Sequence, residues 1–276
     1  MTKKQIFKVA CLQINSGNDI EQNIAKVKKM VKKAARNGAD FIVTPENVLL
    51  MSKNAKDLAT KTFHEDDNPG LLAFKEIAKE CGKWILLGSL AIRKKGNEKY
   101  VNRSYLINDK GKIVEHYDKI HLYDVTLDNG EVYEESKTVQ SGKHIKMAKM
   151  PWGKLGMTVC YDLRFPHLFR SLAKAGAEFI TVPAAFVKYT GQAHWHTLLR
   201  ARAIENGCYI IAPGMTGKHP SGRETYGHSL IVDPWGHILA EAGEKEEIIY
   251  ADVDAARVKQ VRKCLPSLLH DRDFRF

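Results

Sequence analysis

Two stretches of the chain decide the fold, ARNGADFIVTPE at residues 35–46 and AKAGAEFITVPA at residues 173–184, because they match each other without a gap. Each reads as the end of a helix, a glycine that closes it, an acidic residue, and a short apolar strand followed by a proline. A match of this length indicates an internal repeat. The sequence therefore predicts two halves with the same local structure.

Two further pairs of segments extend the repeat at a second offset. SYLINDKGKIVEH at residues 104–116 matches SLIVDPWGHILAE at 229–241, and GKWILLG at 82–88 matches GCYIIAP at 207–213. The longer pair predicts a hairpin in each half, with a glycine at the turn position that needs positive φ. Both halves then read strand, helix, strand, helix, strand, hairpin.

This alternation of strands and helices predicts an α/β fold in which nearly continuous apolar strands are covered by helices. The helices of the second half are expected at residues 166–176 and 193–207. Two matching halves favour two sheets packed face to face with helices outside, although one large mixed sheet fits the periodicity almost as well. No linker rich in proline, glycine or serine divides the chain, so we expect one domain over residues 1–276.

The composition is that of an ordered globular protein. The 276 residues are 44% hydrophobic, yet no stretch reaches the roughly 18 to 20 consecutive apolar residues of a membrane-spanning helix. The apolar run near the N-terminus is short and interrupted, unlike that of a signal peptide. The five cysteines are scattered and form no C-x-x-C pair, which argues against a disulfide framework and against a thiolate zinc site. We expect a cytoplasmic protein without a membrane partner.

The net charge of +11 raises the question of nucleic-acid binding. Much of the excess lies in EQNIAKVKKMVKKAARNG, residues 21–38, where apolar residues recur at helical spacing and lysines fill the positions between them. The segment has no aromatic side chain that could stack on bases, so we interpret it as a solvated helix face and expect no nucleic-acid partner. A positive surface still suits a small anionic substrate.

Three reactive side chains follow predicted strands: Glu46 after FIVTP, Lys119 after KIVEHYD, and Cys160 after KLGMTV. Reacting groups collect beyond the carboxyl ends of strands in α/β sheets, so we expect the three to share a site. Taken singly, each has an ordinary explanation, since a cysteine at a strand end usually packs and an exposed lysine is common. Together they suit nucleophilic catalysis.

The roles follow from what each group can do. Cys160 would attack a carbonyl carbon as the thiolate. Glu46 would take the thiol proton and return it to a leaving amine, provided that burial raises its pKa toward neutrality. Lys119 and the backbone N–H of Tyr161 would stabilise the oxyanion. A modest dipole from the helix that begins near Pro166 would favour the thiolate.

The segments VTPEN, DKIHLYD and VCYDLRFP, in this order, resemble the three signatures of the nitrilase superfamily of carbon–nitrogen hydrolases. The resemblance runs over essentially the whole chain. It implies a Glu-Lys-Cys triad at Glu46, Lys119 and Cys160, a four-layer αββα sandwich, and dimers or larger homo-oligomers. It also implies a second glutamate after the lysine, which VYEESKTVQSG places at Glu135, where a carboxylate would hold the ammonium in position.

Within that superfamily, GQAHWHTLLRARAIENGCY and RETYGHSLIVDPWG resemble the branch that contains deaminated glutathione amidases, with ω-amidases acting on α-ketoglutaramate as a sister group. The resemblance implies cleavage of an amide in a small anionic substrate through a thioester on cysteine, without a cofactor. N-carbamoyl amidohydrolase and nitrilase activities remain open alternatives. A non-catalytic interaction module is the alternative from another class, but such a relative would have lost a triad residue.

Further residues are candidates for substrate binding. Arg164 lies four positions after the cysteine and could bind a carboxylate in a fork, or pair with Asp162. Phe186 follows the second repeat strand and should face the same cleft, although a place in the core fits the sequence equally well. His194 and His196 lie two positions apart on a helix and point in opposite directions, so we expect no metal shared between them and predict no metal site.

Overall fold

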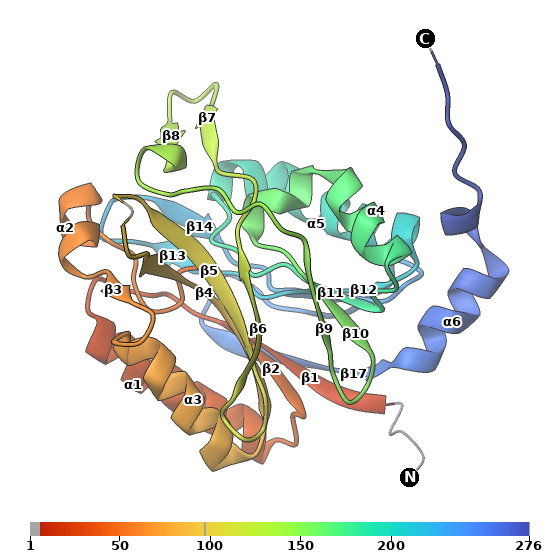
Figure 1. The fold of residues 1–276 in the computed structure, drawn as a ribbon, viewed down its shortest axis with the longest axis horizontal. Coiled ribbons are helices and arrows are strands. Elements are labelled where there is room, and N and C mark those ends of the chain that lie inside the picture. Colours follow the sequence, from red (N-terminus) through yellow and green to blue (C-terminus); the bar gives the residue numbers. More distant parts are fainter. Residues whose placement is uncertain (1–5, 97, 276) are drawn as a thin grey trace.

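The computed structural model describes residues 6–96 and 98–275, which form two sheets that lie face to face between layers of helices (Figure 1). In the seven-stranded sheet the order is β17 (Glu247–Asp254), β1 (Ile6–Gln13), β2 (Phe41–Val43), β4 (Trp84–Arg93), β5 (Tyr100–Ile107), β6 (Ile113–Asp118), with β3 (Phe63–His64) beside β4. In the six-stranded sheet it is β16 (Ile238–Glu241), β15 (Leu230–Val232), β12 (Tyr209–Ala212), β11 (Phe179–Thr181), β10 (Lys154–Met157), β9 (Lys146–Lys149).

The helices cover the outer faces of the sheets. Figure 1 shows α1 (Ile20–Arg36) and α3 (Pro69–Cys81) beside the first sheet, and α4 (Pro166–Lys174) and α5 (Lys188–Asn206) beside the second. The short helix α2 (Ala55–Thr60), the C-terminal helix α6 (Ala255–Cys264), and the hairpins β7–β8 (Asp124–Thr126 and Val132–Glu134) and β13–β14 (Thr216–Lys218 and Glu224–Tyr226) complete the described part. The predicted four-layer αββα sandwich is confirmed. None of the described helices combines the length and apolarity that crossing a membrane requires.

The internal repeat is a repeat of topology. Strands β1, β2, β4, β5 and β6 are adjacent in this order, and β10, β11, β12, β15 and β16 have the same order in the other sheet. In both series the first two pairings are parallel and the last two antiparallel. The two hairpin turns each have a glycine with positive φ, Gly111 at 72° and Gly236 at 88°. A single mixed sheet is therefore excluded.

The main core lies between the sheets. Alternate residues of β1 face opposite sides: Val9 and Cys11 belong to the cluster between the sheets, whereas Ala10 and Leu12 pack toward α1 and α3. This is the two-residue period of a strand that is buried on both faces. Phe7 makes a direct contact between the sheets, with its ring 5.2 Å from that of Phe179.

One helix begins earlier than predicted. We expected the second helix of the second half to begin at Ala193, but α5 starts at Lys188. The glycine at position 191 lies inside the helix against the ring of Tyr226, and a Cβ atom there would come within 2.5 Å of that side chain. Close packing, not chain reversal, accounts for this glycine.

A bulge in β4 holds the segment that follows β2. The pairing of β4 with β5 shifts register between Leu87 and Leu90. There the backbone N–H of Gly88 donates to Thr44 Oγ1 at 3.0 Å, and Ser89 Oγ accepts from the N–H of Asn47 at 2.9 Å. Glu46 lies between these two anchors, so the bulge sets its position.

Gly88→Ala should therefore destabilise the protein and displace Glu46. A Cβ atom at this position would lie 2.0 Å from the carbonyl oxygen of Thr44 and 2.2 Å from that of Pro45, both of them backbone atoms. Overpacking of this kind costs about 1–3 kcal/mol, which urea unfolding would measure. Gly17→Ala is the matched control, because its Cβ would meet nothing within 4 Å. Equal stability of the two variants would contradict this account.

Candidate active site

The structure brings Glu46, Lys119 and Cys160 together at the wall of one cavity of about 720 Å³. All three side chains are buried, with exposures of 3%, 2% and 6%. Lys119 Nζ lies 3.0 Å from Glu46 Oε1. Three residues that are distant in the chain thus share one buried wall of the cavity, as the strand ends predicted.

Glu46 is held by donors from both halves of the chain. Its Oε1 accepts from Lys119 Nζ and from Asn102 Nδ2, the latter at 2.8 Å, and its Oε2 accepts from the backbone N–H of Ala185 at 2.9 Å. Asn102 lies on β5, in the first sheet, whereas Ala185 follows β11, in the second. The carboxylate therefore links the two sheets as well as facing the cavity.

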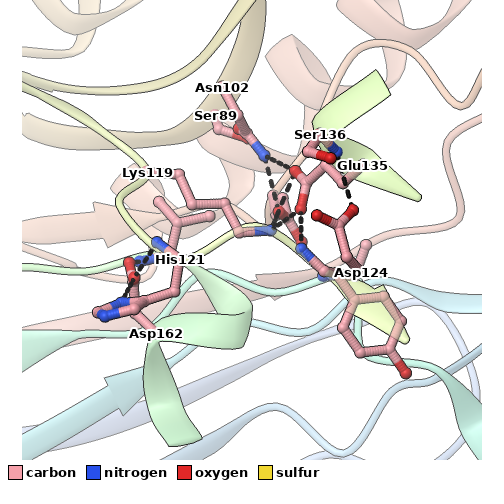
Figure 2. A network of polar contacts seen from close by, with 12 residues as sticks. Ser89, Asn102, Lys119, His121, Asp124, Glu135, Ser136 and Asp162 are labelled. Carbon is pink, nitrogen blue, oxygen red and sulfur yellow. Dashed lines mark hydrogen bonds and ion pairs between the residues drawn. The ribbon is translucent and has the colours of Figure 1, made fainter. Parts of the chain in front are cut away.

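Lys119 directly follows β6 and is clamped by a second carboxylate. Its Nζ donates to Glu135 Oε2 at 2.8 Å and to Oε1 at 3.1 Å. Figure 2 shows Lys119, Asn102 and Glu135 converging on one another. Glu135 Oε2 also accepts from the backbone N–H of Tyr123 at 2.7 Å, which fixes its orientation. The expected contact between the second glutamate and the lysine is present.

Cys160 opens a 3-10 turn, Cys160–Arg164, which begins after a two-residue gap from the end of β10. Its φ of 49° is one that L-residues other than glycine rarely adopt. The turn is held by Asp162, whose Oδ2 accepts from the N–H of Val159 at 2.8 Å and whose Oδ1 lies 2.7 Å from Nδ1 of His121 (Figure 2). Asp162 thus joins the cysteine turn to the segment after Lys119, and Arg164 does not pair with it.

The pKa values of Cys160 and Glu46 differ from one expectation. Burial raises the pKa of the Cys160 thiol well above its usual range, and the Glu46 charge adds to this rise, while the charges of Lys119 and Arg223 oppose it. Burial also acts to raise the pKa of Glu46, but the Lys119 charge and the donors to the carboxylate outweigh it, so that pKa is lowered. The expected rise of the Glu46 pKa toward neutrality is therefore wrong. The resting pair is a thiol beside a carboxylate.

Lys119 is held in its charged form. Burial acts to lower its pKa, but the charges of Glu135 and Glu46 reverse the effect and raise the pKa above its usual range. An ammonium group that stays protonated at every accessible pH can serve as a permanent electrostatic partner for a developing oxyanion. The predicted charge of this residue agrees with its surroundings.

Of the three residues expected to bind substrate, two line the cavity and one does not. Tyr161 and Phe186 line the cavity. Arg164 is not among its lining residues: its NH2 lies 3.2 Å from His194 Nδ1, and its guanidinium stacks over the rings of Tyr161 and Phe186. Arg164 therefore supports the aromatic wall from behind.

The sequence analysis missed Arg223, which lines the cavity from the turn between β13 and β14. Its NH2 donates to the carbonyl of Ala185, the residue whose N–H holds Glu46, and its guanidinium lies 5.3 Å from the centre of the Tyr133 ring. Its Nε is buried without a hydrogen-bond partner in the described part of the chain. No local pattern distinguishes this arginine from the other surface cations of the sequence.

A buried histidine holds the hairpin that carries Arg223. His219 is 5% exposed, and its Nε2 lies 2.7 Å from Thr225 Oγ1, while its Nδ1 lies 3.2 Å from the carbonyl oxygen of Ser16. Burial lowers the pKa of His219 to about 4, the Arg223 charge acts in the same direction, and the Ser16 carbonyl opposes it. The hairpin is thus attached to the segment that follows β1 by a neutral imidazole.

Sequence comparison identifies relatives of the whole chain. The profile of the carbon-nitrogen hydrolase family matches residues 8–263. Deaminated glutathione amidase from Yersinia enterocolitica is 41% identical over 266 residues, covering 96% of this chain and 92% of the relative. The human protein of the same name is 38% identical and covers 96% of this chain and 82% of its own length.

Solved structures share the fold. The NitFhit protein of C. elegans is 33% identical with a TM-score of 0.90 over 97% of this chain, which spans only 65% of that longer protein. Nit3 of Saccharomyces cerevisiae, described as a member of branch 10 of the nitrilase superfamily, is 29% identical with a TM-score of 0.86, and the match covers 95% of both chains.

The neutral state of His219 predicts a pH-dependent stability. The pKa of His219 is lower in the folded chain than in the unfolded one. The neutral imidazole therefore stabilises the folded state fully above about pH 6.5, and this stabilisation is lost as the pH falls toward about 4. The loss should reach about 3 kcal/mol at most, measured by urea unfolding across this range. His219→Gln should remove this component, whereas His144→Gln, at an exposed histidine, should not. Parallel stability curves for the wild type and His219→Gln would refute this role.

Proposed function

The chain belongs to the carbon-nitrogen hydrolase family, and from this premise we propose that it is a thiol amidase whose substrate is deaminated glutathione. The observation that carries the proposal is similarity over 96% of the chain to bacterial and mammalian relatives of that name. The cavity supports it, because a cysteine, a carboxylate and an ammonium line one buried wall. ω-Amidase activity on α-ketoglutaramate is the alternative that the same wall allows.

In the first half of the reaction, the sulfur of Cys160 attacks the amide carbon while its proton passes to Glu46. The electron pair of the carbonyl moves onto oxygen, where Lys119 and the backbone N–H of Tyr161 stabilise it. As the second residue of its 3-10 turn, Tyr161 has an N–H that no carbonyl within the turn accepts. Collapse breaks the C–N bond, Glu46 returns the proton to the leaving amine, and a thioester remains.

The lowered pKa of Glu46 is compatible with this role. Lys119 donates to Glu46 in the resting state, and its charge is the main reason for the low proton affinity of the carboxylate. When negative charge develops on the substrate oxygen, Lys119 is shared with it, so the proton affinity of Glu46 rises as the thiol gives up its proton. In the second half, Glu46 takes a proton from water, which hydrolyses the thioester.

Arg223 is our candidate for holding a carboxylate of the substrate. Two other cations of the cavity are paired, since Lys119 contacts Glu46 and Glu135, and Lys137 lies 2.5 Å from Glu134. The third, Lys53, is solvent-exposed. Arg223 lines the same cavity and has no ion pair within the described residues. A guanidinium free of carboxylates is the group best suited to bind an anionic substrate.

We also propose that the protein is cytoplasmic and forms a homodimer or larger homo-oligomer. Reduced cysteines support the location, and the five cysteines of the chain are free thiols. Exposed apolar side chains support the assembly: Trp235 is 49% exposed and Leu239 is 42% exposed. Sedimentation equilibrium of the purified chain measures the assembly directly.

Purified protein should release 2-oxoglutarate faster from deaminated glutathione than from α-ketoglutaramate. This acid is a product of amide cleavage in both compounds, so one coupled assay compares them. Cys160→Ala should lower turnover by at least about 10³-fold because no nucleophile remains, while circular dichroism stays unchanged. Turnover near that of the wild type in this variant would overturn the thiol mechanism, and preference for α-ketoglutaramate would assign the ω-amidase activity instead.

Arg223→Met should weaken the reaction with the anionic substrate specifically. Loss of one charge-assisted hydrogen bond should lower kcat/KM by roughly 10- to 150-fold, mainly through KM. With a methyl ester of the substrate, the same substitution should lower kcat/KM little, because the ester lacks the negative charge that Arg223 would bind. Lys218→Met is the control, because this lysine lies on the same hairpin with 80% of its side chain exposed and outside the cavity. Equal losses with both substrates would show that Arg223 only supports the hairpin.

A further inference from the structure

Outside the cavity, three potential metal ligands converge from three separate elements. His196 comes from α5, His228 from the turn between β14 and β15, and Glu241 from the end of β16. His196 Nε2, His228 Nδ1 and an oxygen of Glu241 all lie within 4.8 Å of one another. We propose that these residues form a binding site for a divalent transition-metal ion, with Zn²⁺ as the ion to test.

The separations of the ligand atoms are close to those of a coordination sphere. Glu241 Oε1 lies 2.8 Å from His196 Nε2 and 3.2 Å from His228 Nδ1. Zinc bonds of about 2.0–2.2 Å place neighbouring ligand atoms of a tetrahedral site roughly 3.3–3.5 Å apart. An opening of less than about 1 Å in each of these two pairs, with the two imidazole nitrogens, which lie within 4.8 Å of one another, brought to the same spacing, would admit the ion.

The backbone holds His228 in place before any ion arrives. Its φ of 50° is unusual for a residue other than glycine, and its N–H donates to the carbonyl of Gly243 at 3.2 Å. Its carbonyl accepts from Trp195 Nε1 at 2.7 Å, and its ring stacks on Tyr226 with centroids 4.3 Å apart. A ligand that is already oriented loses little entropy when it binds.

The donor set selects the class of metal. Two imidazoles and one carboxylate suit Zn²⁺ and its transition-metal neighbours, whereas Ca²⁺ and Mg²⁺ prefer oxygen ligands alone. The side chains of the three residues are 31%, 21% and 38% exposed, so water can reach the remaining coordination position.

The site would also join elements at the back of the cavity. Trp195, next to His196 on α5, contacts the ring of Phe186 at 5.0 Å, and the N–H of Tyr226 donates to the Phe186 carbonyl at 2.9 Å. A bound ion would therefore stabilise the folded chain around this aromatic wall, since ligands that bind only the native state raise its stability.

Isothermal titration of the metal-free protein with Zn²⁺ tests the proposal. The wild type should bind one ion at this site, and His196→Ala or His228→Asn should weaken that binding by at least about tenfold. Asparagine is chosen at position 228 because it tolerates positive φ. His194→Ala is the matched control: this histidine lies on the same helix but contacts Arg164, so its loss should leave the affinity unchanged.

Co²⁺ distinguishes this site from the thiols of the protein. The cluster contains no sulfur, so the cobalt spectrum should lack a thiolate charge-transfer band and should change in His196→Ala. Circular dichroism of each variant checks that the fold is intact. Binding with the same affinity in the wild type and both cluster variants, or a thiolate band that disappears only in Cys160→Ala, would overturn the proposal.

Discussion

The structure depends on one buried positive charge. The ammonium group of Lys119 is almost completely removed from water, and a charge in that position is tolerable only if opposite charges and hydrogen bonds replace its hydration. Glu46 and Glu135 supply them, and Asn102 donates to both carboxylates. Removing either glutamate would leave the ammonium with one carboxylate partner instead of two, and removing both would leave an uncompensated buried ion. The requirement for charge balance thus holds the segments after β2 and β6 and the 3-10 turn at Glu135 together.

The same charge balance connects the two halves of the repeat. Glu46 in the first half corresponds to Ala184 in the second, so equivalent strand ends carry different chemistry. In the second half these positions provide backbone groups instead: the Pro183 carbonyl accepts from the N–H of Cys160 at 2.9 Å, and the Ala185 N–H donates to Glu46. The two halves therefore have equivalent strand ends, but the side chains at these ends differ. As a result, the site between the sheets is asymmetric.

Residues that are local to a motif could be assigned from sequence, whereas their environment could not. The positions of Glu46, Lys119 and Cys160 beyond strand ends follow from the predicted strands, and Glu135 follows from resemblance to a known family. The direction of the Glu46 pKa was predicted incorrectly, because burial was considered without the Lys119 charge that outweighs it. Arg164 was chosen for its proximity to Cys160 in the chain, but a residue four positions away can point behind the wall, as it does here.

The sequence by itself determined the α/β class, the repeated succession of strands and helices along the chain, and the candidate reactive residues, because these depend on periodicity, turn chemistry and short motifs. The pairing order of the strands and their division into two sheets came from the tertiary structure. Tertiary structure alone decided which distant groups meet. Arg223 reaches the cavity because His219 fixes its hairpin to Ser16, 203 residues away in the chain. His196, His228 and Glu241 converge only after α5 packs on the second sheet. Such contacts depend on packing geometry, which no local pattern of residues encodes.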